Sequence, residues 1–158
     1  MIGSLLYVTA SQPDVMQAVG QVARFQAAPK ESHIIFVKRI LRYLKSTEEY
    51  GLWYPKGRNI IIQAFTDADW VESVDDRKST SGAAFYLGSC LVLWLRKKKT
   101  SISLSTMEVE YIAVATCCTK VLWMKQNLQD IQVQFSELIP ILFDNTSAIS
   151  ISKNLVMH

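Results

Sequence analysis

The sequence predicts an α/β protein in which two helices precede a mixed β-sheet. Short apolar runs separated by turn residues follow Gly51, a pattern that is typical of antiparallel strands joined by tight connections. Residues 105–129 carry apolar side chains at helical spacing. An apolar run at 140–143 comes after that segment, and a strand reached through a helix usually lies parallel to its neighbour.

Residues 1–50 are expected to form a separate helical part. Pro13 suits the first turn of a helix that would run to about residue 27, where Ala28-Pro29 would end it. A second helix is expected from about Glu31 to Lys45. Its apolar face would carry Ile34, Val37, Leu41 and Leu44, and its other face Lys38, Arg39, Arg42 and Lys45.

Residues 51–158 are expected to form the sheet and its helices. Strands are predicted at about 51–55, 60–66, 82–88 and 91–96, with turns at 55–57 and 88–89. The long helix at 105–129, a strand at 140–143 and a helix at 146–153 complete this part. We expect three β segments after Gly51 to form an antiparallel meander, with strand 140–143 parallel to the strand that ends near Asp67.

Acidic residues stand at the ends of three predicted elements. Asp67 and Asp69 follow the apolar run at 60–64, Glu108 and Glu110 lie in the first turns of the long helix, and Asp144 follows strand 140–143. Three carboxylates brought together in this way could bind Mg²⁺ and support two-metal phosphodiester hydrolysis. The alternative for the first of these segments is a solvated acidic turn.

Composition bounds the remaining possibilities. The chain has 158 residues, 49% of them hydrophobic, and a formal net charge of +3, which is enough for one modest core and only mildly basic. Its three cysteines form no CxxC pair, so buried free thiols are expected. No apolar run reaches the length of a membrane span. We expect a monomer.

Four consecutive cations stand at the end of the last strand of the predicted meander: Arg96, Lys97, Lys98 and Lys99. Such a run could contact the phosphates of a nucleic acid or the surface of a protein partner. The alternative is a solvated turn in which lysines discourage aggregation at a sheet edge. The sequence leaves both interpretations open.

Several motifs together resemble the C-terminal part of a Ty1/copia-type retrotransposon polyprotein. Residues 60–154 resemble its ribonuclease H domain through Thr66-Asp67-Ala68-Asp69-Trp70, Asp76-Arg77-Lys78-Ser79-Thr80-Ser81-Gly82, Leu104-Ser105-Thr106-Met107-Glu108-Val109-Glu110-Tyr111 and Asp144-Asn145. Residues 1–52 resemble the end of the reverse transcriptase through Ile2-Gly3-Ser4-Leu5-Leu6-Tyr7, Pro13-Asp14-Val15 and Lys38-Arg39-Ile40-Leu41-Arg42-Tyr43-Leu44-Lys45. The resemblance implies a ribonuclease H-like fold, Mg²⁺, and cleavage of RNA–DNA hybrids, with Asp67, Glu110 and Asp144 as the metal-binding acids. With this set of acids, Asp69 is expected to be peripheral, and Glu108 to point away from the sheet.

The sequence also departs from the family's pattern. Family members continue past His158 into a last strand and helix that carry a fourth metal-binding acid, so a truncated, catalytically incomplete domain is expected here. Loss of one carboxylate from a two-metal site would lower the rate by about 10²–10⁴. Hybrid cleavage is therefore expected to be weak or absent, with Mg²⁺ bound weakly or not at all.

The string Arg39-Ile40-Leu41-Arg42, followed by Glu48-Glu49, resembles the translocation motif of RxLR effectors from oomycete plant pathogens. The copia family carries the same helix, which explains the string without any export. Residues 2–10 are a poor match to a signal peptide, because no basic segment precedes them.

Three hypotheses follow. The favoured one is a retroelement-derived protein that acts by binding, in its concrete form a secreted RxLR-type effector that enters the host cell and modulates plant defence through a host protein. The second is an active ribonuclease H module that cleaves RNA in RNA–DNA hybrids inside the cell. The third is an inert relic.

Overall fold

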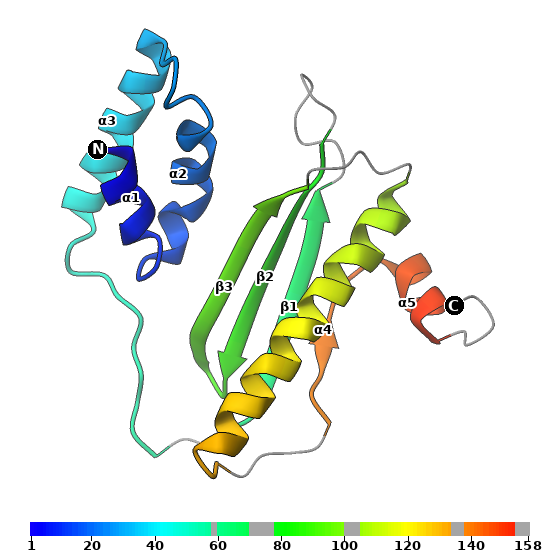
Figure 1. Ribbon diagram of the computed structural model, residues 1–158. Coiled ribbons are helices and arrows are strands. Elements are labelled where there is room, and N and C mark those ends of the chain that lie inside the picture. Colours follow the sequence, from blue (N-terminus) through cyan, green and yellow to red (C-terminus); the bar gives the residue numbers. More distant parts are fainter. Residues whose placement is uncertain (58–59, 70–77, 100–104, 134–137, 154–158) are drawn as a thin grey trace. The chain divides into compact units, whose positions relative to one another are not determined.

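The computed structural model describes residues 1–57, 60–69, 78–99, 105–133 and 138–153 (Figure 1). The chain divides into two compact units, Met1–Trp53 and Tyr54–His158, three residues beyond the boundary expected at 50/51. Within the described residues, none of the helices combines the length and the apolar character that a membrane crossing requires.

The first unit is helical. It contains α1 (Ile2–Val8), a 3₁₀-helix (Pro13–Val15), α2 (Met16–Ala23) and α3 (Glu31–Ser46). The prediction of two helices here was incomplete, because α1 was not expected. This short helix is held by tertiary packing, since Leu5 is buried in a cluster with residues of the other helices: Val15, Val19, Val22, Val37 and Ile40.

Helix α2 ends earlier than expected. The backbone N–H groups of Arg24, Phe25 and Gln26 bond to carbonyls three residues back, so residues 24–26 tighten into turns. Helix α3 then begins at Glu31, as predicted. Its entry is fixed by His33, whose Nδ1 accepts the backbone N–H of Lys30 at 3.1 Å and whose ring stacks on Phe25 with 4.1 Å between ring centroids.

The second unit contains a four-stranded mixed sheet in the order β3-β2-β1-β4. Its strands are β1 (Ile62–Asp69), β2 (Thr80–Leu87), β3 (Cys90–Lys98) and β4 (Ile141–Leu142). The first three form an antiparallel meander, and β4 pairs parallel to β1. The α/β class and the mixed sheet are thereby confirmed, and the topology is compatible with a ribonuclease H-like fold.

Two strand predictions need correction. The expected strand at 51–55 was wrong, because none of these residues is in a strand. Pro55 lacks a backbone donor, and the Tyr54 hydroxyl instead donates to the Leu91 carbonyl at 2.8 Å. Strand β1 also runs to Asp69 rather than to residue 66, since its pairing with β2 continues to the pair Asp69–Thr80.

The connection between β2 and β3 turns at Gly88, whose φ of +60° suits glycine.

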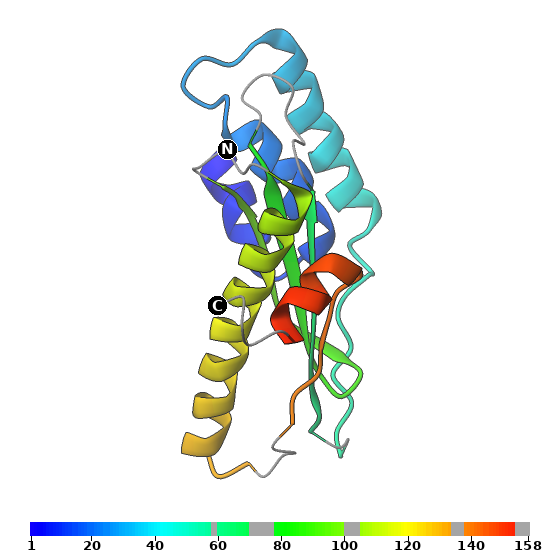
Figure 2. The same ribbon diagram turned by 90° about the vertical axis from the view of Figure 1, so that its right-hand side faces the viewer.

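One face of the sheet is covered by α4 (Thr106–Asp130), which both views show running along the strands (Figures 1 and 2). The Ser105 side chain caps this helix by accepting the Glu108 N–H at 3.2 Å. The core between sheet and helix contains Ile62, Ala64 and Phe85 from the strands with Cys117, Val121 and Met124 from α4. Helix α5 (Thr146–Lys153) contacts α4.

Candidate metal centre

Asp67 lies near the end of the central strand β1. It pairs with Gly82 of β2, and its side chain is exposed. Side chains alternate along a strand, so Asp67 shares a face with Phe65, and the buried Ala64 points to the other face, against α4. The strand therefore presents the carboxylate outside the core.

Glu110 comes from the second turn of α4 and is 6% exposed. It lies on the same helical stripe as Ala113 and Cys117, which are also buried, so the stripe carries Glu110 towards the sheet. Glu108 is exposed and belongs to the capped first turn. The two glutamates thus lie in different environments, although only two residues separate them.

Asp144 follows the short parallel strand β4. The β1–β4 pairing places Leu142 opposite Phe65 and ends there. Asp67 lies two residues beyond Phe65 on β1, and Asp144 lies two residues after Leu142, past the end of β4, which brings both to the same end of the sheet. No β4 residue stands beside Asp67, and this leaves the edge of β1 open to the two other carboxylates.

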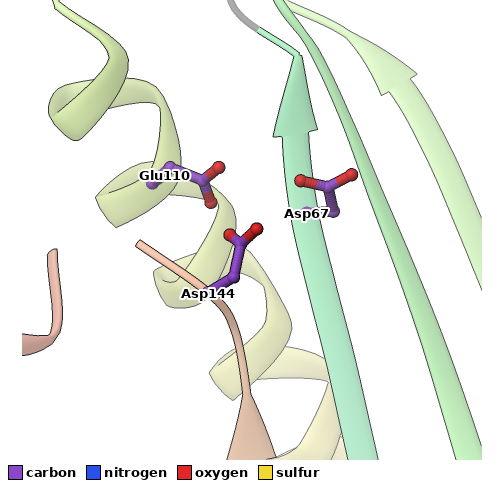
Figure 3. A group of neighbouring side chains, drawn as sticks. All are labelled: Asp67, Glu110 and Asp144. Atoms are coloured by element: carbon purple, nitrogen blue, oxygen red, sulfur yellow. The ribbon is translucent and has the colours of Figure 1, made fainter. Parts of the chain in front are cut away.

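The three acids meet at this edge (Figure 3). One carboxylate oxygen from each of Asp67, Glu110 and Asp144 lies within 4.8 Å of the other two. Three like charges at this separation repel one another, and burial of Glu110 adds a desolvation cost. A divalent cation offsets both costs, and carboxylate oxygens are the ligands that Mg²⁺ prefers. The donor set therefore fits a hard divalent cation.

Other residues of the acidic motifs lie wholly or partly outside the described structure. The backbone of Asp69 belongs to β1, but its side chain lies outside the described part of the structure, as do Asp76 and Arg77. The expectation that Asp69 is peripheral stays a prediction.

The basic run lies mainly in a strand rather than in a turn. Arg96, Lys97 and Lys98 belong to the edge strand β3, and the Lys99 N–H donates to the Ser79 carbonyl at 2.8 Å. Burial lowers the pKa of the Lys99 ammonium, and the nearby Lys97 charge lowers it further.

The four residues that resemble a translocation motif lie in the middle of α3. Arg39, Leu41 and Arg42 are exposed, and Ile40 is 5% exposed within the helical core. The string is therefore part of a packed helix, and only three of its side chains are accessible in the folded unit.

The structure adds a feature that the sequence analysis missed. An open groove of about 560 Å³ adjoins the acids and is lined by Phe65, Asp67, Gly82, Ala84, Leu142 and Asp144, among others. The sequence feature that could have indicated this groove is the two-residue spacing of Phe65 and Asp67. That spacing puts an aromatic ring and a carboxylate on the same face of a strand.

Curated relatives cover the whole chain. It is 34% identical over its full length to "Retrovirus-related Pol polyprotein from transposon RE1" of Arabidopsis thaliana, of which it spans 11%. It is 37% identical over 99% of its length to the corresponding polyprotein from transposon TNT 1-94 of Nicotiana tabacum, of which it spans 12%. It is also 36% identical, over 78% of its length, to "Secreted RxLR effector protein 161" of Plasmopara viticola, of which it covers 87%.

No family model matches the chain, and no solved structure gives a significant match. The full-length similarity to transposon polyproteins agrees with the motifs around Asp67, Glu110 and Asp144. The chain belongs to the retrovirus-related Pol sequences of copia-type retrotransposons.

Proposed function

We propose that the second unit is a ribonuclease H-type module that cleaves the RNA strand of an RNA–DNA hybrid with the help of divalent cations. The observation that carries this proposal is the convergence of three carboxylates from β1, α4 and the end of β4 within 4.8 Å. Acids far apart in the sequence are held together there by the fold, at an exposed edge that a large substrate can reach.

Asp67, Glu110 and Asp144 would hold the cations. Bound Mg²⁺ would supply a Lewis acid for the scissile phosphate and would lower the pKa of a coordinated water. The chain's own contribution is placement: Glu110 is fixed by its buried helical stripe, whereas the exposed Asp67 and Asp144 border the substrate side. The cations of β3 would add electrostatic contacts to phosphates.

Hybrid cleavage by the purified chain tests this function. A labelled RNA–DNA hybrid should be cleaved in Mg²⁺ or Mn²⁺, and Asp67→Asn should abolish cleavage because it removes metal-binding charge with little change in shape. Glu108→Gln is the matched control, since it makes the same kind of change on an exposed side chain outside the cluster. No cleavage by the parent chain, or equal loss in both variants, would contradict the proposal. The same assay tests the sequence-based prediction of weak or absent cleavage.

One comparison favours a second candidate function. The similarity to a protein named as a secreted RxLR effector supports a retroelement-derived chain that binds a host protein and modulates plant defence without catalysis. Arg39 and Arg42 are exposed on α3 and accessible to a partner. Arg39→Ala with Arg42→Ala should then impair delivery into a plant cell but not the effect of protein expressed inside it.

The matched control is Lys38→Ala with Lys45→Ala, which removes the same charge from the same exposed helix. Equal delivery of both double variants and the parent chain would contradict the effector function. If the protein shows neither hybrid cleavage nor any host response, the inert relic is the remaining hypothesis.

A further inference from the structure

A small cavity in the first unit is formed by two segments that are distant in the sequence. It is lined by residues 11–14, where the connection after α1 runs into the 3₁₀-helix, and by Thr47, Tyr50, Gly51 and Leu52, which follow α3. Its volume is about 190 Å³, below the range of about 300–1,000 Å³ that is typical of small-molecule sites. The size therefore suits a single side chain rather than a whole small molecule.

A hydrogen bond from α3 holds the carboxylate of this cavity in place. The Tyr43 hydroxyl donates to Asp14 Oδ2 at 2.7 Å, and the Val15 backbone N–H donates to Asp14 Oδ1 at 3.0 Å. Both donors are uncharged, and each carboxylate oxygen keeps a further lone pair. Asp14 is exposed, so its carboxylate is ordered, accessible and able to accept a charged donor.

The hydroxyl groups that line the cavity already use their protons. The Ser11 hydroxyl donates to the Val8 carbonyl at 3.2 Å, and the Thr47 hydroxyl donates to the Tyr43 carbonyl at 2.9 Å. What remains on each hydroxyl oxygen is its capacity to accept. These two side chains therefore offer a ligand acceptors and no donor.

Gln12 carries an acceptor that has no hydrogen-bond partner within the described part of the chain. Its Oε1 is closed off from solvent there, and an unpaired buried acceptor costs free energy. The terminal amide of a glutamine rotates easily, so it can turn towards the cavity that Gln12 lines. A donor placed in the cavity would then pair with Oε1 and remove this cost.

The charge and the aromatic ring around the cavity narrow the choice of ligand. Residues 11–14 and 47–52 contain Asp14, Glu48 and Glu49 and no lysine or arginine. Tyr50 adds a ring that is 77% exposed, on which a planar cation can stack. A guanidinium group matches the charge, the acceptors and the ring, because it is cationic, planar and rich in N–H donors.

We propose that this cavity binds the guanidinium group of an arginine side chain from a protein partner. The group would donate to Asp14 and to Gln12 Oε1, and its flat face would lie on Tyr50. An ammonium group is a compact and more strongly hydrated charge, so lysine fits less well. The acidic surroundings disfavour the α-carboxylate of free arginine, which a peptide bond removes. The site belongs to the first unit and does not depend on the proposed metal centre.

Nuclear magnetic resonance of the isotope-labelled full chain tests the proposal with blocked amino acids, which carry an N-acetyl and an N-methylamide group. Blocked arginine should shift the side-chain amide resonances of Gln12 and bind with a Kd on the order of 1 mM. Blocked citrulline has nearly the same shape without the charge and should bind about tenfold more weakly. Blocked lysine should bind at least about threefold more weakly.

Two variants localise the site. Gln12→Met keeps the length of the side chain but removes the acceptor, and it should weaken the binding of blocked arginine about fivefold. Asp14→Asn removes the charge and should weaken it about tenfold. Gln17→Met is the matched control, because Gln17 is an exposed glutamine of α2 outside the cavity, and it should leave the affinity unchanged. An apolar replacement of an unpaired acceptor costs little stability, so Gln12→Met should fold even if Asp14→Asn does not.

Each alternative result overturns the proposal. Equal affinities for the three blocked amino acids would show that the guanidinium group is not recognised. Unchanged binding of blocked arginine to Gln12→Met would place the ligand outside this cavity. Tighter binding of free L-arginine than of blocked arginine would rule out recognition of a side chain. Absence of any resonance shift at about 20 mM blocked arginine would rule out the site itself.

Discussion

Asp67 stands directly opposite Gly82 across the β1–β2 pair. Because glycine has no side chain, the carboxylate has an open neighbour on one side and the open edge of β1 on the other. The exposed Asp67 carboxylate lies on the sheet face opposite α4, whereas Glu110 comes from the covered side. The site is therefore accessible, although one of its three acids is buried.

Replacement of Gly82 by alanine should be tolerated. The backbone at Gly82 has no positive φ, and a Cβ there meets nothing closer than 3.9 Å. Since glycine weakens a strand interior, Gly82→Ala should raise the free energy of unfolding by about 0.5 kcal/mol. Urea denaturation followed by circular dichroism measures this. A loss of more than about 1 kcal/mol would show that the space above Gly82 is not open.

Removal of the α4 cap should destabilise the second unit. Ser105→Ala deletes the oxygen that accepts the Glu108 N–H, and the expected loss is about 1 kcal/mol in the free energy of unfolding. Thr106→Ala is the control, because it removes an exposed neighbouring hydroxyl from the first helical residue and should change stability by less than about 0.5 kcal/mol. Equal effects of the two changes in urea denaturation would argue against the cap.

The two phenylalanines of the central strands should differ in their contribution to stability. Phe85 is fully buried between sheet and helix, so Phe85→Ala should lower the free energy of unfolding by about 3–5 kcal/mol. Phe65→Ala should cost much less, because Phe65 is 43% exposed in the groove. Denaturant titration of both variants checks the ranking, and similar losses would contradict the assignment of the two sheet faces.

The Cys117 thiol should be unreactive and should make stability depend on pH. Burial, with a smaller contribution from Cys118, raises the Cys117 pKa from 9.0 to about 11. The folded state thus favours the protonated thiol, so its stabilising contribution is complete below pH 9 and is lost as the pH rises from about 9 to 11. Cys117→Ala should flatten this part of the stability profile, and Cys90→Ala, at a less buried position, is the control.

In native protein, a thiol reagent should modify Cys90 and Cys118 before Cys117. Mass mapping of the modified residues over time measures the order. Reaction of Cys117 first would contradict its burial between α4 and the sheet.

The sequence allowed much of the second unit to be predicted. The apolar run before Asp67 indicated a strand. The resemblance to the copia family selected Glu110, which the structure places in the acidic cluster, whereas Glu108 is exposed. Strand β1 extends two residues beyond Asp67 because pairing with β2 outweighs the low strand propensity of aspartate. At residues 51–55 the error was the reverse, because a strand was predicted from apolar residues that pair with none of the strands in the structure.

Other features depend on contacts that no local pattern reveals. Helix α1 is short and begins with weak helix formers, and it is stabilised by the burial of Leu5 against distant helices. The groove requires Phe65 to be paired with Ala84 on one side and with Leu142 on the other. That register joins residues nearly 80 positions apart, so it becomes visible only in the folded sheet.

Direct measurement of divalent-cation binding tests the central claim most sharply. Mn²⁺ titration followed by electron paramagnetic resonance should show binding to the parent chain that is lost in Glu110→Gln, because that change neutralises the buried ligand of the cluster. Glu108→Gln should bind as the parent does. Binding that is unaffected by Glu110→Gln, or no binding to a parent chain that circular dichroism shows to be folded, would contradict a metal centre at Asp67, Glu110 and Asp144.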